Sequence, residues 1–275
     1  NIRIGNVNIP RWLLITIGLS CIAILTSVAF QAPALIRAAR AEAPLIKCLY
    51  PLEMDSTPFN VVMTPFTSVG ADGRATESRD GAQLARILFR YLQPAFGPDS
   101  PVPSTIRSPE QACALSGSTD AEQLAAAAAL AAQVNANVVV YGTIQTQASG
   151  TQFDPRFYVR YEGFEEAPEL TGPQRLGAPI YVSLPITPED YQGVADHQLG
   201  IRMKVLSSVI LGLASYAQNN YAQAIGYFDA AEKTPGWLNG TGKEVIYVLL
   251  GKAYSRRASQ ELAAAYLKPA LANYD

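Results

Sequence analysis

Residues 124–144 read LAAAAALAAQVNANVVVYGTI, and this stretch decides the fold class. Its first part, 124–134, is mostly alanine, which combines the highest helix propensity with a side chain small enough for close packing on a sheet. Thr119 or Asp120 is the expected amino-terminal cap of that helix. The second part, 137–144, predicts a buried strand. An alanine-rich helix that runs directly into a buried strand predicts an α/β domain built in layers.

Two further elements precede this stretch. Phe59 to Met63 (FNVVM) predicts a short strand. After a glycine-containing loop, apolar residues recur at the i, i+3, i+4, i+7, i+8 spacing of one helix face: Leu84, Ile87, Leu88, Tyr91 and Leu92. Ser78 or Asp80 is the expected cap of this helix, and Pro94 ends it. The five prolines in residues 94–109 then predict loop or extended chain.

Two more predicted strands follow the central one. Phe157 to Tyr161 (FYVRY) and Ile180 to Leu184 (IYVSL) are rich in aromatic and β-branched residues. A loop rich in Pro and Glu, residues 162–173, separates them. The resulting order of strand, helix, helix, strand, strand, strand predicts an α/β domain with helices on a sheet over residues 59–190.

Three segments of this domain resemble the amino-terminal domain of TolB-type periplasmic proteins. That family's pattern is a strand ending near Pro-Phe, a helix opened by Asp-Gly, and a later helix running into A-x-x-V-x-G. Pro65-Phe66, Asp80-Gly81 and 136–142 (ANVVVYG) correspond to these features, whereas the proline-rich segment 94–109 departs from the pattern. The resemblance covers residues 59–145, and it implies a domain that lies outside the cytoplasm.

The amino-terminal part carries a candidate membrane anchor. Trp12 to Phe30 (WLLITIGLSCIAILTSVAF) contains no charged residue, and the uncharged run continues to Ile36. A helix rises about 1.5 Å per residue, so a bilayer core of about 30 Å needs ~20 apolar residues. Trp12 stands where an interfacial aromatic residue belongs. The run predicts a single transmembrane helix within residues 12–36, preceded by a flank of residues 1–11.

Two alternatives to a retained anchor remain open. A cleavable signal peptide would use Ala39-Arg40-Ala41, but signal cores usually have about 7–15 residues. A lipoprotein signal would use Cys21, although Gly18-Leu19-Ser20 is a poor match to the residues that precede a lipidated cysteine. Basic residues flank both ends of the span: Arg3, Arg11, Arg37, Arg40 and Lys47. Because these charges leave the orientation open, the TolB-type resemblance decides it in favour of an extracytoplasmic main part.

The segment after the anchor, residues 37–58, contains three prolines and little periodicity, which predicts a linker. Cys21 lies in the apolar run, so Cys48 and Cys113 are the candidates for a disulfide. Two free thiols are an equal alternative, because two cysteines this far apart do not define a disulfide framework.

Residues 200–275 resemble tetratricopeptide (TPR) repeats, which place Leu-Gly in a first helix and small, aromatic and small residues in a second. The first unit is predicted as helices over 202–217 and 221–232. Its packing residues at the repeat offsets are Leu211, Gly212, Ala224, Phe228 and Ala231.

A second TPR-like unit is predicted to follow after a longer loop at Trp237–Lys243. Its packing residues are Tyr247, Leu250, Gly251, Tyr254, Ala263, Leu267 and Ala270. Small residues at such positions let paired helices approach closely. The carboxyl-terminal part is therefore predicted as all-α, TPR-like helical hairpins.

Composition and motifs exclude several functions. A net charge of −2 and a pI near 5.6 provide no basic surface for nucleic acid. His197, the only histidine, has no Ser, Cys or metal-ligand cluster at a recognisable spacing. The glutamates of 162–169 are interpreted as a solvated face. We therefore expect no catalytic residue, no metal site and no cofactor.

The expected function is a membrane-anchored, extracytoplasmic module that binds a protein or peptide and acts as a scaffold, for example as a subunit of a membrane complex. The alternative is the extracytoplasmic sensor half of a transmembrane signalling protein whose cytoplasmic effector precedes residue 1. The sequence starts at Asn1 rather than Met and stops at Asp275 within a predicted helix. We therefore expect both ends to continue into a longer protein.

Overall fold

The computed structural model of the 275-residue chain describes residues 2–4, 7–9, 48, 51, 53–54, 58–70, 72–97, 100–147, 150–182, 198–237 and 242–272. The chain divides into two compact units, Asn1–Tyr50 and Pro51–Asp275. The predicted transmembrane helix, Trp12 to Phe30 within residues 12–36, lies outside the described residues. So does most of the predicted linker, residues 37–58.

The first unit contains a short antiparallel hairpin that we did not predict. Strand β1 (Ile2–Ile4) pairs with β2 (Val7–Ile9), and Arg3 lies opposite Asn8. The two strands, IRI and VNI, place a polar residue between two apolar ones, which is the alternation expected of a strand.

The second unit is built on one mixed sheet of eight strands. Strand β3 runs parallel to both of its neighbours, β6 and β7, whereas β8 pairs antiparallel with β7, β9 and β10. Strand β4 joins the far half of β7 and pairs with β5. The strands are β3 (Asn60–Met63), β4 (Thr67–Val69), β5 (Ala75–Glu77), β6 (Thr105–Arg107), β7 (Val138–Gln147), β8 (Gly150–Val159), β9 (Gly172–Arg175) and β10 (Ile180–Val182).

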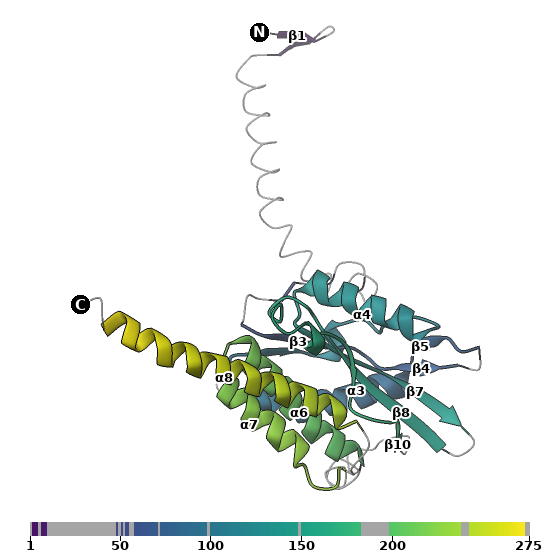
Figure 1. The fold of residues 1–275 in the computed structure, drawn as a ribbon. Helices are drawn as coiled ribbons and strands as arrows, with labels where there is room; N and C mark the ends of the chain where they lie inside the picture. Colours follow the sequence, from purple (N-terminus) through teal and green to yellow (C-terminus); the bar gives the residue numbers. More distant parts are fainter. Residues whose placement is uncertain are drawn as a thin grey trace. The chain divides into compact units, whose positions relative to one another are not determined.

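Helices cover both faces of this sheet (Figure 1). On one face α4 packs on Val62, Val139 and Tyr141. On the other face α3, α6, α7 and α8 share a larger core with Phe153 and Phe157. The α-helices are α3 (Arg79–Leu92), α4 (Asp120–Val134), α6 (Gln198–Ala217), α7 (Tyr221–Glu232) and α8 (Glu244–Ala272), and the short 3-10 turns are η1 (Gln93–Ala95), η2 (Pro109–Gln111) and η3 (Pro168–Leu170). The predicted α/β arrangement of helices on a sheet is confirmed.

The ends of the two sheet-covering helices follow from capping chemistry. Ser78, not Asp80, caps α3, because its Oγ accepts a hydrogen bond from the Gly81 amide at 3.0 Å. Thr119, not Asp120, caps α4, because its Oγ1 accepts from the Glu122 amide. Helix α4 ends at Asn135, which adopts a left-handed conformation with φ of 56°.

Several strands differ from the prediction. The glycine-containing loop before α3 forms the hairpin β4–β5, and the proline-rich segment contributes β6. Strand β8 begins at Gly150 rather than at Phe157, so it is twice as long as predicted. Strand β10 covers only Ile180–Val182 of the predicted 180–184, and residues 183–184 lie outside the described part of the chain.

Helices α6 and α7 form an antiparallel pair joined at Gln218-Asn219-Asn220. Asn219 takes a positive φ of 59°, and the Asn220 side chain caps α7 by accepting from the Gln223 amide. The second predicted hairpin differs, because residues Glu244–Ala272 form one continuous helix of 29 residues. Residues 252–268 contain no Gly or Pro to end it.

Within the described residues, one helix is long and apolar enough to span a membrane, and that helix is α6. Most of its surface is buried, with Val209, Ile210 and Leu213 fully enclosed. Its apolar composition is thus accounted for by its place in the core, where most of its residues are buried while Lys204 is exposed.

Candidate functional site

The residues predicted to pack the first TPR-like unit lie together between α6 and α7. Leu211, Ala224, Phe228 and Ala231 are all buried. The ring of Phe228 lies directly on Gly212, where a Cβ atom would stand 2.3 Å from Phe228 Cε1. Since no side chain fits between the two helices at this point, Gly212 is what allows their close approach.

Of the residues predicted to pack the second unit, Leu250 is partly buried against the core, whereas Tyr247, Gly251 and Tyr254 do not pack. Tyr247 and Tyr254 are each 54% exposed, and Gly251 has open space around it. The buried face of α8 consists instead of Ile246, Leu249 and Ala253. Ala263 belongs to the same continuous helix, and its side chain lies outside the described part of the structure.

Helix α8 therefore presents an exposed apolar face, formed by Tyr247, Val248, Tyr254 and Leu262. At about 100° of rotation per residue, these four side chains fall within an arc of roughly 120° on one side of the helix. Only two other large apolar side chains of the described residues, Tyr161 and Tyr181, are exposed, and both belong to the α/β layer. The face thus concentrates most of the exposed large apolar side chains on one helix.

The helices are fixed to the sheet layer by aromatic and ionic contacts. Tyr216 of α6 stacks on Phe164 with a ring-centroid distance of 5.9 Å, and Tyr221 of α7 meets the same tyrosine edge-on at 5.0 Å. Lys252 and Arg256 of α8 form ion pairs with Glu169 and Glu166. The acidic segment 162–169, interpreted from sequence as a solvated face, is thus partly an anchoring site for α8.

A second site lies on the other side of the sheet, on the ribbon of β7 and β8. One face of this ribbon is apolar, with Val140 opposite Phe157 and Ile144 opposite Phe153. The opposite face is apolar at Val139, near the start of β7. Farther along β7 it becomes polar, and its cross-strand pairs there are Tyr141–Arg156, Thr143–Asp154 and Gln145–Gln152. Helix α4 covers only the apolar half of that face.

Where α4 begins, a polar cavity of ≈ 220 Å³ opens over the uncovered half. We call it the α4 cavity. Its lining includes Asp120, Gln123, Thr143, Gln145, Gln152, Asp154 and Arg156. A second hollow, of ≈ 530 Å³, lies beside it between the β4–β5 turn and the start of α4, and the two share Ser118.

Two arginines and two aspartates form an ion network at the α4 cavity. Arg156 donates from Nε and Nη2 to Asp154 Oδ2, at 2.8 and 2.6 Å, and its Nη1 lies 2.8 Å from Asp120 Oδ1. Arg175 joins both carboxylates, at 2.9 Å to Asp154 and 3.3 Å to Asp120. The network ties the first residue of α4 to β8 and β9 and leaves the four charges balanced.

The protonation of these groups follows from their contacts. The hydrogen bond from Arg156 lowers the pKa of Asp120 below its usual range. Burial acts to lower the pKa of Arg156, but its hydrogen bonds to Asp120 and Asp154 outweigh this and raise it. Burial raises the pKa of Tyr141, which lies under the same network. Asp120 and Arg156 therefore stay ionised at neutral pH.

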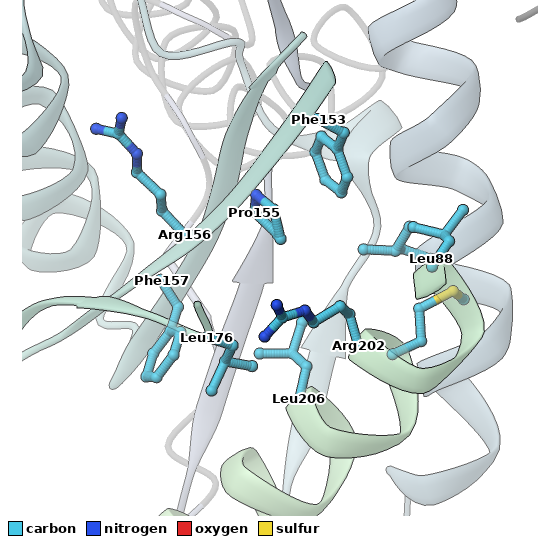
Figure 2. A pocket seen from close by; sticks show the side chains of 10 residues that line it. Leu88, Phe153, Pro155, Arg156, Phe157, Leu176, Arg202 and Leu206 are labelled. Atoms are coloured by element: carbon cyan, nitrogen blue, oxygen red, sulfur yellow. The ribbon is translucent and has the colours of Figure 1, made fainter. Parts of the chain in front are cut away.

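The apolar pocket in Figure 2 is a gap in the core rather than a binding site. It lies between β8, α3 and α6 and has a cavity volume of ≈ 10 Å³, which is roughly enough for a single water molecule. Arg156 points away from it, whereas the Arg202 guanidinium lies among its apolar side chains. Arg202 is buried and lies 5.7 Å from the ring of Trp237. Its pKa is lowered by desolvation.

Within the described part of the chain, no three His, Cys, Asp or Glu side chains are placed to hold a metal ion. His197 lies outside the described residues. The sequence analysis did not predict the α4 cavity. Alternate residues of a strand share one face, so the change from Val139 and Tyr141 to Thr143 and Gln145 indicates that this face of the strand becomes polar.

Comparison with known proteins returned no family model, no curated protein and no solved structure that matches this chain. The fold and the two sites described above are therefore the basis for proposing a function.

Proposed function

We propose that this chain is a membrane-anchored, extracytoplasmic protein-binding or scaffolding module, and that the exposed apolar face of α8 is its binding surface. The observation that carries the proposal is the concentration of Tyr247, Val248, Tyr254 and Leu262 on one side of a helix whose other side is packed. Large apolar groups gathered on an exposed surface are typical of protein interaction sites. Tyrosine in particular is enriched where partners bind.

The kind of partner follows from an internal comparison. Helix α6 carries Leu211-Gly212, and α8 carries the same pair at Leu250-Gly251. The first glycine is covered by Phe228 of the neighbouring helix α7, whereas the second is open. A partner helix that places an aromatic side chain over Gly251, as α7 does over Gly212, would bury Tyr247 and Tyr254 on either side. The proposed partner is therefore an amphipathic helix of another protein, or a further TPR-like helix.

Two observations support a membrane-anchored location outside the cytoplasm. The uncharged run from Trp12 to Ile36 has the length of a bilayer span. Cys48 and Cys113 are each disulfide-bonded, which decides between the two alternatives left open by the sequence. Because disulfides persist in oxidising compartments and are rare in the cytosol, the linker, which contains Cys48, and the α/β domain, which contains Cys113, are expected outside the cytoplasm.

Co-purification from detergent-solubilised membranes tests the binding surface. Partners retained by the wild-type chain should be lost with Tyr254→Ser, which removes apolar contact area from the α8 face. Tyr161→Ser is the matched control, since Tyr161 is 48% exposed but lies in the α/β layer. Equal retention by all three proteins would contradict the assignment of the surface to α8.

A second candidate is the sensor half of a transmembrane signalling protein. The α4 cavity favours it, because a sensor needs a ligand site separate from the surface that contacts other proteins. The reading frame upstream of Asn1 discriminates the two candidates. An encoded cytoplasmic effector domain would support the sensor, and its absence would leave the scaffold.

A further inference from the structure

The α4 cavity contains two buried hydrogen-bond acceptors without a partner among the described residues. Gln123 is only 5% exposed, and its Oε1 accepts no hydrogen bond. Asp154 is 8% exposed, and its Oδ1 is likewise without a donor, while Oδ2 receives every contact from Arg156 and Arg175. Both side chains line the cavity. Buried polar atoms are nearly always hydrogen-bonded in folded proteins, so such a pair indicates a missing donor.

The charges around the cavity restrict what that donor is. Asp120 and Asp154 are already neutralised by Arg156 and Arg175. An anion does not fit, because the unpartnered atoms, Gln123 Oε1 and Asp154 Oδ1, accept hydrogen bonds and an anion needs donors. A cation would lie beside the Arg156 guanidinium, which is itself part of the lining. A neutral ligand with several donor groups satisfies the acceptors without disturbing the charge balance.

Three further polar groups of the lining both donate and accept hydrogen bonds. Thr143 offers a hydroxyl, and Gln145 and Gln152 offer amides. The amides continue to the rim, where Gln147 donates to Gln145 and Gln152, and Gln152 donates to the Tyr181 hydroxyl at 3.1 Å. Tyr181 is 60% exposed and presents an aromatic ring at this edge. Groups that both donate and accept match the hydroxyls of a polyol, which do the same.

We propose that the α4 cavity binds a small, neutral, polyhydroxylated ligand of the monosaccharide class, whose hydroxyls donate to Gln123 Oε1 and Asp154 Oδ1. The cavity volume of ≈ 220 Å³ compares with about 10–15 Å³ for a single water molecule in the same measure, so the cavity has room for a ligand of roughly a dozen or more non-hydrogen atoms. One sugar ring is therefore the appropriate size, and longer chains would extend over the rim at Tyr181. The site lies on the α4 side of the sheet, away from α8, so this inference stands independently of the protein-binding surface.

Calorimetry and thermal unfolding of the full chain in detergent micelles test the proposal. The probes are glucose, N-acetylglucosamine and myo-inositol, with methylammonium chloride and sodium phosphate as charged comparisons. At least one of the three neutral probes should bind and raise the melting temperature. Binding of none of them, or binding of methylammonium or phosphate in their place, would overturn the proposal.

Two variants locate the binding. Gln123→Leu removes one unpartnered acceptor and Thr143→Val removes a lining hydroxyl at nearly constant shape, and each should weaken sugar binding by roughly three- to tenfold. Gln133→Leu is the matched control, because it makes the same change at an exposed position of α4 and should leave binding unchanged. If sugar binds both lining variants as tightly as the control, the ligand occupies another site and the assignment is wrong.

Discussion

Phe228 of α7 covers Gly212 of α6 so closely that even a methyl group at position 212 would overlap its ring. The corresponding glycine of α8, Gly251, has nothing within 4 Å. Both glycines follow a leucine in their helix, but Gly212 is covered by a neighbouring helix and Gly251 is not. This contrast separates the packed part of the helical layer from the part we propose to be a binding surface.

The two glycines give the first prediction. Gly212→Ala should destabilise the protein by about 1–3 kcal/mol, because the added Cβ forces α6 and α7 apart or displaces Phe228. Gly251→Ala should stabilise it by up to about 1 kcal/mol, because alanine is the better helix former at an open position. Urea denaturation of both variants measures the difference. A stabilising Gly212→Ala would contradict the packing described for α6 and α7.

Tyr216 gives the second prediction. Burial raises its pKa to about 12, and its hydroxyl has no hydrogen-bond partner in the described part of the structure. Tyr216→Phe should therefore leave stability unchanged or raise it by up to about 1 kcal/mol, since it removes an unsatisfied group and keeps the ring contacts.

Tyr221 is the matched control for that substitution, because its hydroxyl donates to Asn219 Oδ1 at 2.8 Å. Tyr221→Phe should cost about 0.5–1.5 kcal/mol. Denaturation midpoints of the two variants, measured side by side, provide the test. A larger loss for Tyr216→Phe than for Tyr221→Phe would show that the buried hydroxyl does have a partner.

The ion network at the α4 cavity gives the third prediction, which concerns pH. Because Arg156 lowers the folded-state pKa of Asp120 below the unfolded value of about 3.9, ionised Asp120 stabilises the fold above that pH. This contribution is lost as the pH falls through the lower, folded pKa. The Asp120 side chain is 71% exposed, so solvent screening keeps its contribution within about 1 kcal/mol.

Asp120→Asn should accordingly reduce stability at pH 7 and have a smaller effect near pH 2, where more of the wild-type carboxyl is protonated. Denaturant titrations at the two pH values supply the comparison. A stability loss that is the same at both would assign the effect to helix capping or packing rather than to the ion pairs.

The fourth prediction concerns the anchor and the compartment. The intact chain should remain with membranes after carbonate extraction, and deletion of residues 1–40 should release a soluble, folded protein. In intact cells, Cys48 and Cys113 should resist alkylation until a reductant is added, because both are disulfide-bonded. Extraction of the full chain by carbonate, or free thiols at both positions, would refute the proposed location.

The predictable part of the fold is the part encoded locally. The alanine-rich run and the valines after it predicted α4 and β7, because helix propensity and a continuous apolar stretch act over neighbouring residues. The start of β8 was missed, because Asp154 and Pro155 have low strand propensity. Their place in the sheet depends on Gly142 across the ribbon, where a Cβ would lie 2.8 Å from the Asp154 carbonyl oxygen.

The sites were harder to predict than the fold, for two physical reasons. The ion network joins residues of one helix and two strands: Asp120, Asp154, Arg156 and Arg175. These residues come together only in the folded chain, so no sequence motif or spacing predicts their contact. The repeat pattern in α8 predicted packing for Tyr247 and Tyr254, but packing needs a second helix. Residues 255–265 are good helix formers without a turn signal, so α8 continues and leaves both tyrosines exposed.

The most direct test of the central claim is site-specific photo-crosslinking in intact cells. A benzophenone amino acid replaces Tyr254 on the α8 face and, in a separate protein, replaces Tyr161 on the α/β layer. We predict that irradiation yields a discrete protein adduct from position 254 and none from position 161, and that Leu262→Ser diminishes the adduct. Irradiation that yields no adduct at position 254, or the same adduct at both positions, would contradict a binding surface on α8.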